Sequence, residues 1–403
     1  MKMSKKPQFS RRLEGVSESA TLKLNATVQA MKAQGVDIIN LTAGEPDFWV
    51  PDAAKSAVIE ALQANRSKYT PVPGIPELRE AVATKTNRQQ MSLAQEDLWK
   101  ASHVVITNGA KQALFNALLA LLNPGDAVLI PSPYWLSYPE MVKIAGGIPQ
   151  FISAPLSQGF KIQPQQLENA LNFQVKAIIL NSPCNPTGAV YSKEEFQALA
   201  KVLSHHPAAG NVWIISDEIY DRIHFGRIPF CSFLDAAPEL RDRTITLNGL
   251  SKSAAMTGWR VGWSVASEEI TQAMIIIQGQ STSGINALAQ WAGLAAIQLP
   301  EENFVSQIQS FKQRRDLLLD QLKNRIHLEL FTPDGAFYAF IGIRYYLKPG
   351  ENSIGFAQRL LEEAHVAVVP GTPFGEQQFI RLSFATDPKA IAEGCRRFSQ
   401  YLN

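Results

Sequence analysis

The chain has 403 residues, of which 46% are hydrophobic and 18% are charged, and its formal net charge is +2. This length exceeds one simple compact unit, so we expect two domains and a large buried core. The small net charge, without long runs of one sign, gives no electrostatic reason to expect a nucleic acid or an anionic membrane as partner, and a small-molecule ligand is favoured.

The cysteines and the N-terminal segment indicate the compartment. Cys184, Cys231 and Cys395 lie far apart, without the Cys-x-x-Cys spacing of zinc sites and redox pairs, which favours a reducing cytoplasm. The basic start, MKMSKKPQFSRR, leads into no apolar segment, and no apolar stretch approaches the roughly 20 residues of a membrane span. We therefore expect a soluble cytoplasmic protein without a targeting segment.

Short apolar runs rich in β-branched residues predict strands that are buried on both faces. These predicted strands are residues 103–107, 127–131, 176–180, 212–216, 244–247 and 261–265. Segments with helical periodicity lie between several of them, at residues 111–122, 134–145 and 193–204. The alternation predicts an α/β fold with a mainly parallel sheet that is covered by helices.

Two long helices are predicted after this block, at residues 286–297 and 302–325, and strand-like pieces and a final helix follow. We expect these C-terminal elements to form a second, smaller α+β domain that the N-terminal segment joins. The predicted division is an N-terminal segment of the small domain at 1–52, a large domain at 53–298 and a small C-terminal domain at 299–403.

Ligands of open α/β sheets bind beyond the carboxyl ends of the strands, so the residues that follow each predicted strand are candidates for a site. After the first strand, Gly109-Ala110-Lys111 opens a helix whose free backbone N–H groups suit an anion such as phosphate, although the segment taken alone is better explained as an ordinary strand-to-helix turn. After the third, two prolines in NSPCNPTG fix the backbone and give Asn185 a definite direction.

The fourth and fifth strands end in charged residues. Asp217 ends the apolar run VWIIS, where a carboxylate is costly unless a cation or a donor meets it, and a role as helix N-cap is the alternative. Lys252 follows the fifth strand, with Arg260 eight residues further on. Desolvation of such a lysine lowers its pKa and makes its amine a nucleophile toward carbonyls, and a surface lysine in a loop is the alternative.

In this order, these segments resemble the class I pyridoxal-phosphate aminotransferases of fold type I, specifically the prokaryotic-type aspartate aminotransferase branch. The resemblance runs from about residue 19 to the C-terminus and is carried by the motifs LTAGEPDF, KYTPVPGIPELREA, TNGAKQALFNA, PSPYWLSYPEM, NSPCNPTGAVY, SDEIYD, NGLSKSAAMTGWRVGW, DGAFY, VAVVPGTPFG and FIRLSFAT. It implies the fold type I architecture, a mainly parallel central sheet sandwiched by helices with a smaller α+β domain, and pyridoxal 5'-phosphate as cofactor.

The resemblance implies three catalytic residues. Lys252 matches the lysine that forms the internal aldimine and moves the proton between the substrate α-carbon and cofactor C4′, work that needs an amine acting as nucleophile and base. Asp217 matches the acid that keeps the pyridine nitrogen protonated. Tyr220, together with Asn185, matches the pair that hydrogen-bonds the cofactor oxygen O3′.

Further cofactor contacts are implied at the ring face and at the phosphate. Trp135 matches the aromatic residue that stacks on the ring, with a core aromatic as the alternative. Tyr69 matches a residue that reaches the phosphate from the neighbouring subunit, which implies a homodimer with shared active sites. The implied phosphate ligands are Gly109, Ala110, Ser251 and Arg260.

The substrate residues follow from the same resemblance. Arg381 matches the arginine that grips the substrate α-carboxylate, with backbone from Gly44 close by, and Trp135 and Asn185 also belong to this group. Lys111 matches the lysine that pairs with the distal carboxylate of aspartate or glutamate, and assistance to the phosphate is its alternative role. We predict L-aspartate and 2-oxoglutarate as substrates, with oxaloacetate and L-glutamate as products.

One segment departs from the family pattern. Many close relatives read Val-Lys-Pro-Ser-Ala-Thr near the N-terminus, whereas this chain reads Val-Ser-Glu-Ser-Ala-Thr at residues 16–21. The lost lysine and the added acid of Glu18 change the entrance to the site and weigh against bulkier dicarboxylates such as prephenate. Ser19 and Thr21 remain candidates to bind a side-chain carboxylate.

Other functions stay open at this point. An aminotransferase for aromatic amino acids and a cysteine-conjugate β-lyase share the cofactor contacts, and Lys111 weighs against the first. From a different class, the fold serves as the cofactor-sensing module of transcriptional regulators. A dinucleotide-dependent dehydrogenase is disfavoured because no Gly-x-Gly-x-x-Gly follows a predicted strand, and the six histidines are scattered, so no metal site is expected.

Overall fold

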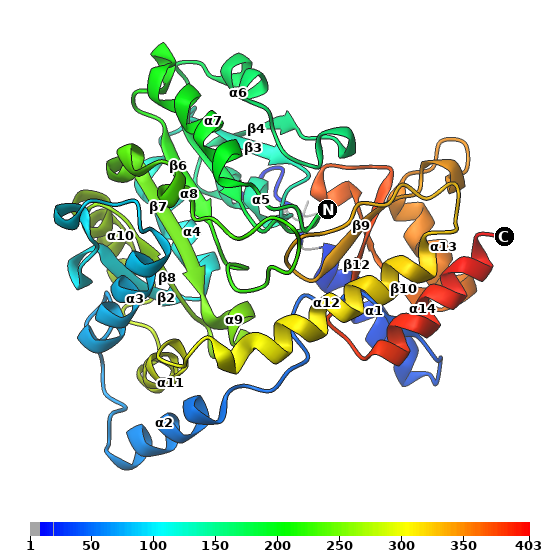
Figure 1. Ribbon diagram of the computed structural model, residues 1–403, viewed down its shortest axis with the longest axis horizontal. Coiled ribbons are helices and arrows are strands. Elements are labelled where there is room, and N and C mark those ends of the chain that lie inside the picture. Colours follow the sequence, from blue (N-terminus) through cyan, green and yellow to red (C-terminus); the bar gives the residue numbers. More distant parts are fainter. Residues whose placement is uncertain (1–8, 19) are drawn as a thin grey trace, which may run out of the picture.

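The predicted strands form one central sheet in the computed structural model, which describes residues 9–18 and 20–403 (Figure 1). Within these residues the sheet has seven strands, in the order β2-β8-β7-β6-β5-β3-β4. The strands are β2 (Val104–Asn108), β3 (Ala127–Ser132), β4 (Ile148–Ser153), β5 (Val175–Asn181), β6 (Trp213–Asp217), β7 (Thr244–Gly249) and β8 (Val261–Val265). All six predicted strands are confirmed, with small differences at their ends.

Strand β4 was not predicted. Its sequence, IPQFIS, contains a proline and a glutamine and lacks a continuous apolar run. It pairs only with β3, at the edge of the sheet, where a proline is tolerated because one side of the strand needs no hydrogen-bond partner. The edge position therefore explains why its pattern differs from that of the buried strands.

The direction of β8 places the loop before it, which contains Arg260, at the sheet edge where the parallel strands end. Strands β3 to β7 pair in parallel, whereas β8 runs antiparallel to both β7 and β2. Between β7 and β8 lie only the short helix α9 (Leu250–Ser253) and a 3-10 turn, which are too short for a parallel crossover. The start of β8, next to Arg260, therefore meets the carboxyl ends of the parallel strands.

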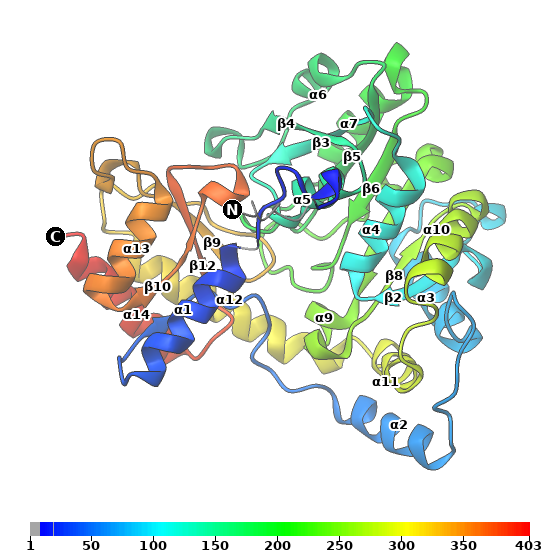
Figure 2. The same ribbon diagram turned by 180° about the vertical axis from the view of Figure 1, so that it is seen from behind.

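Helices cover both faces of the sheet, which confirms the predicted fold class (Figures 1 and 2). Neighbouring residues of one strand point to opposite faces: Ile214 packs into one apolar cluster and Ile215 into another. The helices against the Ile215 face are α4 (Ala110–Leu121), α5 (Ser137–Ile144) and α10 (Glu268–Ser281). Those against the Ile214 face are α3 (Pro76–Gln89), α6 (Pro164–Ala170), α7 (Lys193–His205), α8 (Phe233–Ala236) and α11 (Ala287–Ile297).

A second apolar core lies beside the first. It is built on an antiparallel sheet in the order β11-β12-β9 and includes the buried Phe356, Leu382 and Phe398. Its elements are α12 (Glu302–Leu322), β9 (Tyr338–Gly342), α13 (Ser353–Ala364), β10 (Val366–Ala367), β11 (Val369–Pro370), β12 (Phe379–Ser383) and α14 (Pro388–Tyr401). In Figure 1 the long helix α12 runs from the large sheet to this core.

The N-terminal part of the chain packs on the second core. Strand β1 (Ile39–Asn40) pairs in parallel with β10, so that Ile39 faces Val366. Helix α1 (Ala20–Ala33) lies beside the C-terminal elements in Figure 2, whereas α2 (Asp52–Gln63) packs on α11 at the other end of the molecule. We keep the division after residues 52 and 298 as a proposal.

Short 3-10 helices complete the described structure. They are η1 (Arg11–Leu13), η2 (Gln95–Asp97), η3 (Ala101–His103), η4 (Leu156–Gln158), η5 (Pro207–Ala209), η6 (Pro238–Arg243), η7 (Thr257–Trp259), η8 (Arg344–Tyr346) and η9 (Thr372–Phe374). None of the helices in residues 9–18 and 20–403 combines the length and the apolar character needed to cross a membrane.

Candidate active site

Side chains from the strand ends converge on one cavity of about 340 Å³. Most of the predicted site residues line it: Gly44, Ala110, Lys111, Trp135, Asn185, Asp217, Tyr220, Ser251, Lys252, Arg260 and Arg381. Gly109 lies against the guanidinium of Arg260 at its rim. Tyr69 does not line the cavity, because its side chain projects from the single chain and is fully exposed.

Lys252 is a buried amine in helix α9, directly after β7. Its Nζ donates a hydrogen bond to the carbonyl oxygen of Gly44. Burial lowers the pKa of Lys252 to about 8. The charge of Glu45 raises this pKa, and the charges of Arg381 and Arg260 lower it further. A sizeable fraction of neutral amine therefore exists near neutral pH, as a lysine nucleophile requires.

Asp217 ends β6 with its carboxylate inside the cavity wall, and only 6% of the residue is exposed. The hydroxyl of Tyr138 donates to Oδ2 at 2.6 Å, and the backbone N–H of Ile219 donates to Oδ1 at 3.3 Å. Burial raises the pKa of Asp217, although these two donors lower it. No cation of the described residues forms an ion pair with this carboxylate, so a cationic ligand group would stabilise it.

Arg381 is the opposite case, a buried cation on β12 with 3% exposure. Its Nη1 donates to Oδ1 of Asn185 at 2.9 Å and its Nη2 to the Thr42 carbonyl at 3.3 Å, while its Nε has no hydrogen-bond partner. Burial lowers the pKa of Arg381. Because no carboxylate of the described residues pairs with it, this guanidinium is suited to hold the carboxylate of a ligand.

Two polar side chains lie between these charges. The Tyr220 hydroxyl contacts that of Tyr338, with 3.0 Å between the oxygens. The amide oxygen of Asn185 is occupied by Arg381, which leaves its amide N–H groups free to donate into the cavity. Both residues are almost fully buried, so their hydroxyl and amide groups have fixed directions.

The start of helix α4 has the features of an anion site. Gly109, at φ 74°, precedes the helix, and Arg260 lies against it, with Nη2 donating to the Asn108 carbonyl at 3.0 Å. A side chain at position 109 would displace this guanidinium, and the left-handed φ itself favours glycine there. The free N–H groups of the helix start, the charge of Arg260 and the Ser251 hydroxyl suit a phosphate group.

Lys111 and Trp135 form another wall of the cavity. The Nζ of Lys111 donates to the Ser137 hydroxyl at 3.2 Å and lies 5.2 Å from the centre of the Trp135 ring. Burial, and then the charge of Arg260, lower the pKa of Lys111. No carboxylate of the described residues pairs with Lys111, so it is a second cation available to an anionic ligand.

Sequence reasoning missed several residues of the cavity wall. Tyr138 and Tyr338 both contact a predicted site residue and are almost completely buried. Tyr138 stands three residues after Trp135 in PSPYWLSYPEM, a helical spacing that would have placed both on one face. Tyr338, in DGAFY, carries no comparable signal, because its partners come from distant parts of the chain.

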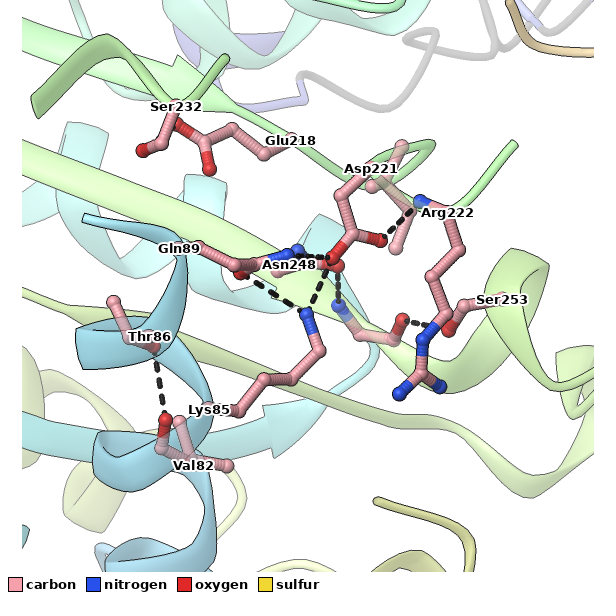
Figure 3. A network of polar contacts seen from close by, with 12 residues as sticks. Val82, Lys85, Thr86, Gln89, Glu218, Asp221, Arg222, Ser232, Asn248 and Ser253 are labelled. Atoms are coloured by element: carbon pink, nitrogen blue, oxygen red, sulfur yellow. Dashed lines mark hydrogen bonds and ion pairs between the residues drawn. The ribbon is translucent and has the colours of Figure 1, made fainter. Parts of the chain in front are cut away.

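A buried polar network binds Glu218 and Asp221 of the segment Ser216–Asp221, and these two residues do not line the cavity (Figure 3). Oε1 of Glu218 accepts hydrogen bonds from the Ser216 and Ser232 hydroxyls at 2.9 and 2.8 Å and from the Phe233 N–H at 3.2 Å. All three donors are neutral, and burial raises the pKa of Glu218 to about 7. Glu218 therefore anchors the segment away from the cavity while Asp217 faces it.

Asp221 anchors the other end of this segment. Figure 3 shows its carboxylate pointing to Lys85 and Gln89 of helix α3, which bind it through an ion pair and a hydrogen bond of 2.7 Å. Burial raises the pKa of Asp221, but the charges of Lys85 and Arg222 outweigh this, so the pKa lies below its ordinary value of 3.8. Asp217 and Tyr220 thus belong to a segment that is fixed at two points.

Known proteins resemble the chain over nearly its whole length. Residues 36–398 match the family model described as aminotransferase class I and II. A probable aspartate/prephenate aminotransferase of Rhizobium leguminosarum bv. phaseoli is 41% identical over 396 residues, covering 96% of this chain and 97% of that protein. An aspartate aminotransferase of Rhizobium meliloti strain 1021 is 39% identical over 399 residues, covering 97% and 95%.

Among solved structures, the aspartate aminotransferase of Thermus thermophilus with maleate has a TM-score of 0.90 and 39% sequence identity. The similarity covers 98% of this chain and 100% of that one. In the part of the chain that the structure describes, no group of three or more His, Cys, Asp or Glu residues is placed to hold a metal ion.

Loss of Lys85 should destabilise the fold strongly. The variant Lys85→Met leaves the Asp221 carboxylate, whose side chain has 0% exposure, without its ion-pair partner. We expect a loss of about 3–5 kcal/mol in the free energy of unfolding, measured by urea denaturation at pH 7. The control is Lys55→Met, whose ion pair with Asp52 is exposed on α2, and it should leave stability unchanged.

The difference in the free energy of unfolding between wild type and Lys85→Met should become smaller at acidic pH. Because the folded-state pKa of Asp221 is lowered, the ion pair contributes fully above a pH of about 4 and its contribution is lost as the pH falls through the folded-state pKa. A difference that stayed constant from pH 7 to pH 3, or equal stability of the two variants, would contradict this role of the pair.

Proposed function

The chain belongs to the class I and II aminotransferase family, and on this basis we propose that it transfers the amino group of L-aspartate to 2-oxoglutarate, giving oxaloacetate and L-glutamate. The observation that carries the substrate assignment is the pair Arg381 and Lys111. Both are cations that line one cavity without a carboxylate partner among the described residues. A dicarboxylic amino acid supplies one carboxylate for each.

The names of the relatives support this assignment. The Rhizobium meliloti protein is an aspartate aminotransferase, and the Thermus thermophilus structure of an aspartate aminotransferase contains maleate, a compound with two carboxylates. The same family membership favours an aminotransferase over a cofactor-sensing module of a regulator. A cysteine-conjugate β-lyase stays the alternative within the enzymes, because it shares the cofactor contacts.

The cavity fits pyridoxal 5'-phosphate as cofactor. The buried carboxylate of Asp217 has no cation of the described residues beside it, which suits a protonated pyridine nitrogen. The start of α4 with Arg260 suits the phosphate, and the buried amine of Lys252 suits an aldehyde. When bound, this cofactor supplies a carbonyl carbon that accepts the amino group and a ring that withdraws electrons.

Each remaining role belongs to a residue of this chain. Lys252 would hold the cofactor covalently and, once released, would carry the proton from the substrate α-carbon to the cofactor carbon C4′. Asp217 would keep the proton on the ring nitrogen, and Tyr220 and Asn185 would donate hydrogen bonds to the ring oxygen O3′. Trp135 would cover one face of the ring.

The substrate is held at both ends. Arg381 binds the α-carboxylate, with the backbone of Gly44 beside it, and Lys111 binds the distal carboxylate. A neutral aromatic side chain would leave Lys111 partly buried and without a counter-charge, which disfavours aromatic amino acids. Ser251, at the phosphate end, adds a hydroxyl donor.

We propose that prephenate is a poor substrate, although several relatives are named aspartate/prephenate aminotransferases. The segment before α1 lies over α5, where the Ser17 N–H donates to Glu140 at 2.9 Å and Lys143 donates to the Gly15 carbonyl at 2.8 Å. Glu18 follows directly and is exposed, so it adds negative charge where many relatives carry a lysine. Ser19 and the side chain of Thr21 lie outside the described residues.

We propose a homodimer in which Tyr69 reaches the phosphate of the neighbouring subunit. Tyr69 is 101% exposed and Trp49 is 87% exposed, which is costly for such large rings in a monomer. Ile59 and Leu62 of α2 add apolar surface nearby in the chain. The free cysteines Cys184, Cys231 and Cys395 support the proposed cytoplasmic location.

The homodimer predicts a sedimentation mass twice that of the chain at micromolar concentration. Tyr69→Phe should keep this mass but weaken the binding of the cofactor, because it removes only the hydroxyl that would contact the phosphate. Tyr345→Phe, which changes another exposed tyrosine, serves as control. A monomer in sedimentation would refute the shared site.

Replacement of Lys252 should slow the reaction with amino acids strongly. With wild type and bound cofactor, L-aspartate alone should release one equivalent of oxaloacetate and change the visible absorbance. Lys252→Ala should slow this release by at least about 10²–10⁴-fold, since it removes the base. Lys348→Ala, at an exposed lysine, is the control. Release of pyruvate and ammonia from cysteine conjugates, without an amino acceptor, would instead identify the β-lyase.

Replacement of Lys111 should change the substrate preference. In Lys111→Met, kcat/KM for L-aspartate should fall by about 10–100-fold, the loss expected for a charge-assisted hydrogen bond, while kcat/KM for phenylalanine should fall much less. Lys201→Met, at an exposed lysine of α7, is the matched control. Wild-type protein that turned over alanine or phenylalanine far better than aspartate would overturn the assignment.

A further inference from the structure

Tyr338 contacts two of the predicted site residues, Tyr220 through its hydroxyl and Arg381 through its ring. It is the first residue of β9, is 1% exposed and lines the cavity. In the antiparallel pairing of β9 with β12, Tyr338 faces Ser383, and Arg381 stands two residues before Ser383. Because side chains two residues apart share one face of a strand, Tyr338 and Arg381 are diagonal neighbours on the same face.

The hydroxyl of Tyr338 fixes that of Tyr220. The two oxygens are 3.0 Å apart, and neither hydroxyl has another hydrogen-bond partner among the described residues. Each phenol has a single proton to donate. When Tyr338 donates its proton to the Tyr220 oxygen, Tyr220 does not donate back to Tyr338. The Tyr220 proton therefore stays available for an acceptor in the cavity.

The ring of Tyr338 orients Arg381. The guanidinium carbon lies 4.2 Å from the ring centre, closer than the 5.0 Å to the Phe374 ring. A buried cation that lacks a carboxylate gains from the negative face of an aromatic ring. The contact also fixes the plane of the guanidinium, and with it the direction in which a carboxylate can bind.

From these contacts we propose that Tyr338 is a positioning residue for both Tyr220 and Arg381. Its hydroxyl keeps Tyr220 as a donor toward the cofactor oxygen, and its ring holds Arg381 for the substrate carboxylate. The proposal rests on the function proposed above and adds a residue whose two groups act on different ligands. It does not require Tyr338 to touch the substrate or the cofactor.

Two variants separate the two contacts. Tyr338→Phe keeps the ring and removes the hydroxyl, whereas Tyr338→Leu removes both. The control is Tyr345→Phe: Tyr345 is 62% exposed, and its ring and hydroxyl also contact an arginine, Arg344, but away from the cavity. Folding of each variant is checked by its thermal transition.

The first measurement is the pH midpoint of the absorbance change of the bound cofactor, which does not depend on turnover. A donor to O3′ stabilises its deprotonated form, so loss of an oriented donor should raise the midpoint. We expect an increase of about half a pH unit in Tyr338→Phe, less than in Tyr220→Phe, and no change in Tyr345→Phe. The double variant Tyr220→Phe/Tyr338→Phe should match Tyr220→Phe, because Tyr338 acts through Tyr220.

The second measurement is the KM for L-aspartate. Tyr338→Phe should leave it within about twofold of wild type, whereas Tyr338→Leu should raise it by about tenfold, as loss of a desolvated cation–π contact predicts. A wild-type midpoint in Tyr338→Phe, or a double variant shifted beyond Tyr220→Phe, would overturn the proposal even if Tyr338→Leu fails to fold. Wild-type protein that binds no cofactor would instead overturn the proposed function itself.

Discussion

The structure depends on charged groups that are removed from water without a counter-charge from the chain. Asp217 and Arg381 are both almost fully buried, one an anion and the other a cation, yet they do not pair with each other. Burial of an unpaired charge is expensive, and the hydrogen bonds that Asp217 accepts from Tyr138 and that Arg381 donates to Asn185 offset only part of the cost. A ligand is therefore bound most favourably when it places a positive charge next to Asp217 and a negative charge next to Arg381. This requirement makes binding specific.

Rigid support makes this demand specific. In the segment SDEIYD, Asp217 and Tyr220 face the cavity while Glu218 and Asp221 face away and are bound by residues of α3, β6 and α8. The alternation places functional and anchoring side chains on one short stretch of backbone. If the Asp217 carboxylate could move toward water, it would lose its preference for a cationic ligand. By fixing the backbone, Glu218 and Asp221 keep Asp217 buried.

The sequence was most informative where local patterns and motifs coincide. The six buried strands were predicted because each is a continuous apolar run, whereas β4 was missed because an edge strand tolerates Pro149 and Gln150. The cavity gathers most of the predicted residues because the carboxyl ends of parallel strands meet at one edge. Tyr338 was missed because its contacts with Tyr220 and Arg381 join distant parts of the chain, which no local pattern encodes. The role proposed for Tyr69 requires a second chain.

The pairing of β1 with β10 has a consequence for synthesis of the protein on the ribosome. Ile39 pairs with Val366, and the following residues Thr42 and Gly44 contribute backbone carbonyls to Arg381 and Lys252. An emerging chain thus exposes this stretch until its partner strand β10, which lies hundreds of residues further along the chain, has been translated. Domains usually fold in the order in which they are made. Here the part of the cavity around Arg381 forms only after both Thr42 and Arg381, which are far apart in the sequence, have been made.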